Sequence, residues 1–217
     1  MTPSQVKVKY IRIMTLILTG IFCLTILLAI IFYPAEYKFF QYYISELGGT
    51  LTTKSNFPLS NQISQYIFAI GLITTGIIAL FISGEYLAKR NRSKLNILKG
   101  VCLLLTLIGS ILVAFPHNIA EFALIHQIGA FMYVVSLDLY GFFCQFMRYR
   151  HMRITLNTQE KPGRRIDKYF VILIILVTLV YFAFYMFEVT KDWTPLVQKI
   201  VLLFSVIGML LLDKEDF

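Results

Sequence analysis

Long runs of apolar residues, separated by short polar segments, dominate the pattern of this chain. A helix of about 20 apolar residues crosses a hydrocarbon core of about 30 Å. In lipid a helix also satisfies its own backbone hydrogen bonds, which an isolated strand cannot do. The pattern therefore predicts six transmembrane helices. They lie near residues 11–33, 62–87, 98–115, 122–147, 169–187 and 195–212.

Composition supports an all-α polytopic membrane bundle. Hydrophobic residues make up 58% of the chain and charged residues only 15%, which is far too apolar for a soluble domain. Six spans with short loops fill the 217 residues, so we expect residues 1–217 to form a single integral membrane domain. The first run is too long for the apolar core of a secretory signal peptide, and no small-residue cleavage site follows it, so we expect it to remain as a helix.

The positive charges predict an orientation. Sixteen of the 20 Lys and Arg residues lie before the first run or at its start, between the second and third or at the start of the third, between the fourth and fifth, or after the sixth. By the positive-inside rule these segments are cytoplasmic, with both termini inside. We expect a multi-pass protein of a bacterial or archaeal plasma membrane. Topology explains the net charge of +8, so the expected partners are membrane lipids or an apolar small molecule, and not nucleic acid.

Several kinds of chemistry are not predicted. The 3 cysteines lie in or beside predicted spans with no Cys-x-x-Cys or Cys/His spacing, so we expect neither disulfides nor a metal site. No Walker loop, GxSxG elbow, HExxH motif or dinucleotide fingerprint occurs in a suitable context. Three histidines are too few for a bundle that binds two haems. We therefore expect no cofactor, and the sequence leaves oligomeric partners open.

The first outer loop contains the segment PAEYKFFQYYISELGG, which predicts a short amphipathic helix from about Pro34 to the glycines at 48 and 49. Its apolar face, suited to the lipid interface, holds Phe40, Tyr43, Ile44 and Leu47. Ser45 and Glu46 end this helix above the bundle, where they could position a lipid headgroup. Alternatively, the helix only caps the bundle and both side chains are solvated.

The second outer loop contributes His117, Asn118, Glu121 and His126. His117 and Glu121 are spaced so that they can meet on one helical turn. His126 lies within a predicted span, where ionisable residues are costly and often functional. It could equally make a structural hydrogen bond between helices. With Ser45 and Glu46, these residues form a candidate binding or catalytic set at the outer mouth of the bundle.

Asp138 lies near the middle of the fourth predicted span. A charged carboxylate there is costly, so we expect a buried neutral carboxyl bonded to a hydroxyl, such as that of Thr106, Ser110 or Thr178. A rise of about 18 Å separates Asp138 from His126 along a helix, so one reaction centre cannot use both.

Several short motifs resemble the membrane family known as domain of unknown function 998 and, more remotely, the Frag/DRAM/Sfk membrane proteins. The likeness rests on residues 43–48 (YISELG), Asn61, Phe68, Gly71, Gly76, Gly109, Phe115, Pro116, His126, Gly129 and Ala130. It implies a helical bundle with this outer-loop signature and supplies no catalytic residue. The remoter likeness implies lipid handling or membrane organisation.

Three functions are consistent with these features. The favoured one is non-enzymatic binding of a lipid or apolar ligand at the outer mouth, because polar outer loops are common and activated triads are rare. The second is an interfacial hydrolase or transferase that uses His117 or His126 with Ser45 and a glutamate. The third is proton-coupled transport through Asp138.

Overall fold

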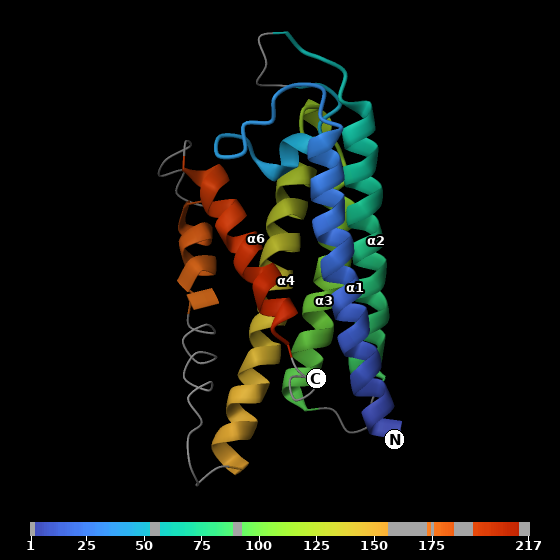
Figure 1. The fold of residues 1–217 in the computed structure, drawn as a ribbon, viewed down its shortest axis with the longest axis vertical. Coiled ribbons are helices and arrows are strands. Elements are labelled where there is room, and N and C mark those ends of the chain that lie inside the picture. Colours follow the sequence, from blue (N-terminus) through green and yellow to red (C-terminus); the bar gives the residue numbers. More distant parts are fainter. Residues whose placement is uncertain are drawn as a thin grey trace.

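The computed structural model describes residues 3–52, 57–88, 93–155, 173–174, 176–184 and 193–212. These residues form an all-α bundle, and those at 173–174 and 176–184 are helical (Figure 1). The named helices are α1 (Pro3–Ile31), the short 3₁₀-helix η1 (Ile44–Gly48), α2 (Gln62–Leu87), α3 (Lys94–Val113), α4 (Ala120–Thr155) and α6 (Thr194–Leu210).

Four helices are long and apolar enough to cross a membrane: Lys7–Ile31, Gln62–Leu87, Lys94–Val113 and Ala120–Phe146. Helix α6 is also apolar but shorter. The predicted helices at the first four runs and the sixth are confirmed, although α3 begins earlier than expected because Ser93 caps it by accepting a hydrogen bond from the Asn96 amide at 3.2 Å. The predicted fifth span lies partly outside the described residues.

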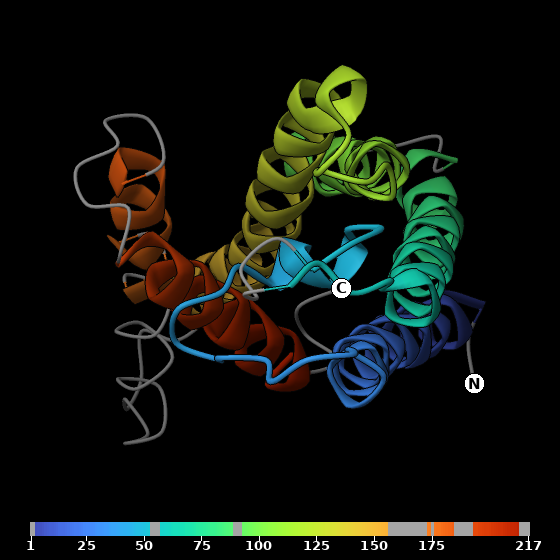
Figure 2. The same ribbon diagram turned by 90° about the horizontal axis from the view of Figure 1, so that it is seen from above.

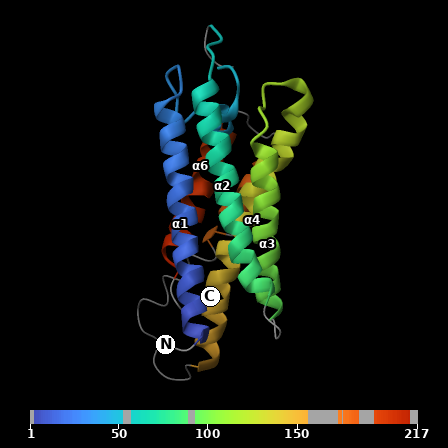
Figure 3. The same cartoon turned by 90° about the vertical axis from the view of Figure 1, so that its right-hand side faces the viewer.

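Helices α1 to α4 pack in sequence order (Figure 3), and small residues mark the closest approaches. A Cβ added to Gly71 would strike Thr25 of α1, and one added to Gly76 would strike Ser110 of α3. Between α3 and α4, a Cβ on Gly109 would lie 2.6 Å from the Tyr133 backbone nitrogen. Since lipid gives no hydrophobic drive for helix association, such close packing contributes much of the stability.

Helix α4 is bonded to each of the other large helices through polar side chains. Tyr140 shares a 3.1 Å hydrogen bond with Thr15 of α1. Tyr133 shares one of 3.0 Å with Thr75 of α2, and Ser136 shares one of 2.9 Å with Thr106 of α3. On α6, Ser205 donates to Asp138 at 2.6 Å. These bonds fix the rotation of α4 within the bundle.

The first outer loop differs from the prediction. No regular helix runs from Pro34 to Tyr43, and only η1 is helical. Seen from above, η1 lies inside the ring of α1, α2, α3, α4 and α6 (Figure 2). At the end of this segment the carbonyls of Tyr42 and Tyr43 accept hydrogen bonds from the side chains of Lys199 and Tyr37 and not from a continuing helix.

Candidate functional site

Two side chains at the start of α2 hold η1 in place. The Asn61 amide donates to the carbonyls of Glu46, Leu47 and Gly49, the last at 2.9 Å. The Ser64 hydroxyl lies 3.2 Å from the Leu47 carbonyl and 2.8 Å from that of Ala29. These bonds satisfy the backbone of a segment that is largely buried.

The loop before η1 is fastened by Tyr37 and Lys199. The Tyr37 hydroxyl donates to the Tyr43 carbonyl at 2.9 Å. Burial, and secondly the charge of Glu46, raise the pKa of Tyr37 above its usual value, so the phenol remains a donor. The Lys199 ammonium donates to the carbonyls of Tyr42 and Pro195 and lies 5.9 Å from the centre of the Tyr37 ring. Lys199 therefore attaches the N-terminal part of α6 to this loop.

Beneath η1 lies a pocket between the helices, towards the end of the bundle that η1 covers. It contains about 340 Å³ of empty space, which includes space open to solvent. Its wall is almost entirely apolar. It is formed by Phe22, Ile26, Ile44, Ser45, Phe68, Leu72, Val113, Ala130, Tyr133, Val134, Gln198 and Leu202. Five helices and η1 thus enclose one space.

A glutamate and two histidines meet beside this pocket. Glu46 Oε2 lies 3.4 Å from His117 Nε2, and the His117 and His126 rings are 5.4 Å apart between centres. The Glu46–His117 distance is that of an ion pair, but the contact does not have the geometry of a hydrogen bond. Neither ring nitrogen of His117 has a hydrogen-bond partner among the described residues. His126 lies one helical turn from Ala130, which lines the pocket.

One ring nitrogen of His126 makes a structural hydrogen bond, and the other has no hydrogen-bond partner in the described part of the chain. It is only 2% exposed, and its Nδ1 donates to the Phe115 carbonyl at 2.6 Å. This contact with the end of α3 agrees with the expected structural role. Its Nε2 has no partner in the described part of the chain, and in the neutral ring that atom is an acceptor.

The other predicted outer-mouth residues have different surroundings. Asn118 accepts a hydrogen bond from the Thr50 amide at 2.9 Å and donates one to its hydroxyl at 2.8 Å, so it joins the α3–α4 loop to the α1–α2 loop. Glu121 is exposed in the first turn of α4, where a negative charge suits the helix dipole. His117 precedes α4 and approaches Glu46 instead of Glu121.

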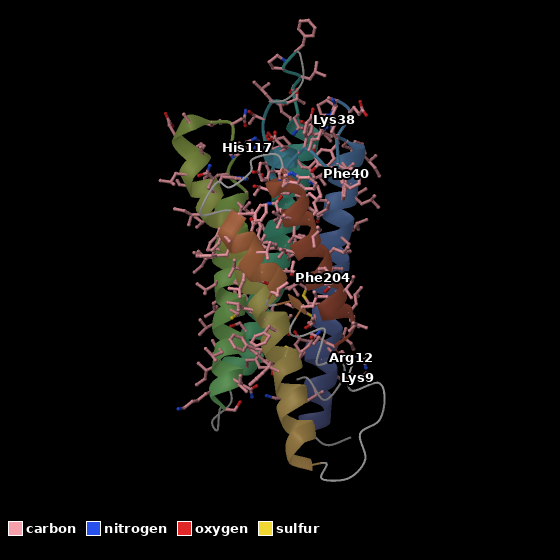
Figure 4. The ribbon with its side chains drawn as sticks, turned by 90° about the vertical axis from the view of Figure 1, so that its left-hand side faces the viewer. Lys9, Arg12, Lys38, Phe40, His117 and Phe204 are labelled. Carbon is pink, nitrogen blue, oxygen red and sulfur yellow. The ribbon has the colours of Figure 1, made fainter. Side chains whose placement is uncertain are left out.

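Figure 4 shows at which end of the bundle His117 lies. It is at the same end as Lys38 and Phe40, opposite the end that holds Lys9 and Arg12.

Asp138 belongs to a separate buried region. It is 2% exposed, and the hydroxyl that reaches it is that of Ser205 on α6. The expectation of a hydroxyl partner is confirmed, but the candidate residues were wrong. Thr106 bonds Ser136 and Ser110 bonds its own helix at Leu107. Thr178 bonds the Ile174 carbonyl.

The fold and its apolar helices define a multi-pass α-helical membrane protein. Within this class, the chain belongs to the family described as protein of unknown function DUF998, whose pattern matches residues 16–212. No curated protein and no solved structure matches the chain significantly. The remoter resemblance to the Frag/DRAM/Sfk proteins remains a prediction.

The residues that carry the family resemblance now have structural roles. Asn61 holds η1, Phe68 lines the pocket, and Gly129 permits close contact with α3. Gln198 and Leu202 were missed because they lie in an apolar run whose position beside the pocket depends on how α6 docks. A glutamine inside an apolar run was the available signal for Gln198.

Proposed function

We propose that this membrane protein binds a lipid chain or another apolar ligand in the pocket beneath η1. The pocket itself is the observation that carries this proposal, because a space lined by apolar side chains inside a bundle excludes water and favours hydrocarbon. Its roof is η1, which the positive-inside rule assigns to the outer face. The ligand therefore enters from the outer leaflet or the outer mouth.

The Glu46, His117 and His126 cluster supports binding near the outer mouth. Ser45, the neighbour of Glu46, lies on the pocket wall. The buried Nε2 of His126 has no hydrogen-bond partner among the described residues, which is costly unless water or a ligand donates a hydrogen bond to it. The cluster thus provides polar contacts beside an apolar space, as ligand sites commonly do.

The other two hypotheses have less support. A hydrolase would need a serine hydroxyl within about 3 Å of a histidine nitrogen, although unliganded sites are often looser. Of the contacts that a hydrolase needs, the approach of Glu46 to His117 is present. The serine–histidine contact is absent among the described residues, since Ser45 makes no hydrogen bond to either histidine. Proton-coupled transport remains a prediction that rests on Asp138, whose described hydroxyl partner is Ser205.

Filling the pocket tests the proposed function. Leu202 lines the pocket and is 6% exposed, so Leu202→Trp places an indole in the space that the ligand needs. We expect an apolar ligand to copurify with the unaltered protein and to be lost from this variant. The measurement is mass spectrometry of lipids and small molecules extracted after purification in a detergent with a different chain.

Leu203→Trp is the matched control. Leu203 follows directly on α6 but is 56% exposed, so its side chain faces away from the pocket. We expect Leu203→Trp to retain the copurifying ligand at the level of the unaltered protein. Equal ligand content in Leu202→Trp and Leu203→Trp, in folded samples, would contradict pocket binding.

A further inference from the structure

The amide group of Gln198 gives the apolar pocket a polar feature with a defined direction. Gln198 is 5% exposed and lines the pocket. Its Oε1 accepts a hydrogen bond from the Ile44 backbone amide at 3.1 Å. Because a backbone N–H can only donate, this bond assigns the oxygen to the side of η1 and leaves the NH₂ group on the other side.

The NH₂ group of Gln198 has no acceptor among the described residues. Because Gln198 lines the pocket, its amide is part of the wall that a ligand would contact. The Ser45 hydroxyl is on the same wall, and it too makes no hydrogen bond within the described part of the chain. Ser45 is half-buried, and a donor in an apolar wall without an acceptor is unfavourable, so a ligand that supplies an acceptor gains affinity and selectivity.

An acceptor oxygen on the ligand would satisfy both donors. Nearby charges limit which oxygen is suitable. Glu46 follows Ser45 directly and is itself buried, so a second carboxylate here would be repelled. Lys199 follows Gln198, but its ammonium donates to the Tyr42 and Pro195 carbonyls. A neutral carbonyl therefore fits better than a free carboxylate, whose burial without a counter-charge is costly.

We propose that the pocket selects a neutral acyl lipid, an ester or an amide, whose carbonyl oxygen accepts hydrogen bonds from the Gln198 amide and the Ser45 hydroxyl. This inference rests on the proposed function and names the ligand class. The carbonyl lies beneath η1, and the hydrocarbon chain extends along Phe22, Leu72 and Leu202. The selection is binding only, with no bond made or broken.

Photocrosslinking tests this selection in the full-length chain in phosphatidylcholine nanodiscs. The probes are a fatty-acid methyl ester, the free fatty acid and an alkane, all of equal chain length and each with a diazirine near the chain end. Labelling at the pocket residue Leu72 is divided by labelling at Leu124, which is 66% exposed and faces outward, to correct for membrane partitioning.

We expect the ester to label the pocket about three- to tenfold more than the alkane, the range that one or two net hydrogen bonds provide. The free acid should not exceed the alkane. In Gln198→Met, which has a similar length but no donor, the ester preference should fall to about that of the alkane. Ser45→Ala, which removes no existing protein hydrogen bond, should lower the preference partly.

Gln145→Met is the control, because Gln145 is also buried and bonds α6, donating to the Gly208 carbonyl at 3.3 Å, yet does not line the pocket. It should keep the ester preference. Equal labelling by ester and alkane, a preference for the free acid, or an unchanged preference in both Gln198→Met and Ser45→Ala would overturn the carbonyl assignment while pocket binding stands. Failure of every probe to label Leu72 would overturn the proposed function as well.

Discussion

At the scale of single residues, a few polar side chains decide where the outer loop lies. Asn61 is 1% exposed and donates to three carbonyls around η1. Glycines next to η1 leave room for its neighbours. A Cβ on Gly48 would lie 2.8 Å from the Phe68 ring, and one on Gly49 would lie 2.7 Å from the His117 ring. The position of η1 above the pocket therefore depends on the Asn61 amide donor and on two glycines that leave room for the neighbouring rings.

Replacing Asn61 by Ala should destabilise the protein by about 1–3 kcal/mol, because buried carbonyls lose their donor. Gln62→Ala, at the next and exposed position, should change stability by less than about 0.5 kcal/mol. Thermal unfolding of the purified variants measures the difference. Equal midpoints for the two variants would show that Asn61 does not hold η1.

At the scale of elements, α4 organises the bundle. Its polar side chains reach α1, α2, α3 and α6 in turn. Its contact with α3 is close because of glycine. A Cβ on Gly129 would lie 2.6 Å from the Leu112 backbone carbon, whereas a Cβ on Gly141 would meet nothing within 4 Å. The same helix thus offers one crowded and one open glycine.

Gly129→Ala should push α3 and α4 apart and cost about 1–3 kcal/mol, as overpacking does. Gly141→Ala should be neutral or stabilise the helix by up to about 1 kcal/mol, since alanine is the better helix former. The unfolding temperatures of the two variants check this. A Gly129→Ala protein as stable as Gly141→Ala would mean that the helices do not rely on this contact.

At the scale of the whole molecule, the pocket and the loop that covers it lie at one end of the bundle. Lys9 and Arg12 lie at the other end (Figure 4). The positive-inside rule predicts that the pocket end is the outer one. If this orientation is correct, a ligand reaches the pocket from the outer leaflet.

Cysteine labelling in cells tests the orientation. Phe57→Cys introduces a thiol in the first outer loop at a position that is 79% exposed, and Ser93→Cys introduces one at the opposite end, before α3. An impermeant maleimide should label Phe57→Cys in intact cells and Ser93→Cys only after permeabilisation. The unaltered chain, with its native cysteines, gives the background. The reverse pattern would place the pocket on the cytoplasmic side.

The hydropathy of the sequence predicted the class of the protein and the approximate positions of the described helices. Hydropathy suffices for this because lipid requires each span to be apolar and to satisfy its own backbone. Helix ends were less accurate, since caps such as Ser93 act locally and apolar runs do not mark them. The expected hydroxyl partner for Asp138 also followed from the cost of burying a carboxyl.

The tertiary structure alone decided which residues meet. The partner of Asp138, the approach of His117 to His126, and the seat of Gln198 under η1 all join residues from different helices or loops. Such contacts depend on the rotation and depth of each helix, which close packing and a few hydrogen bonds set. Apolar periodicity does not encode them. For the same reason the sequence predicted a surface helix at residues 34–48, whereas in the structure residues 34–41 are mostly exposed without a regular helix and only the end of η1 is buried above the pocket.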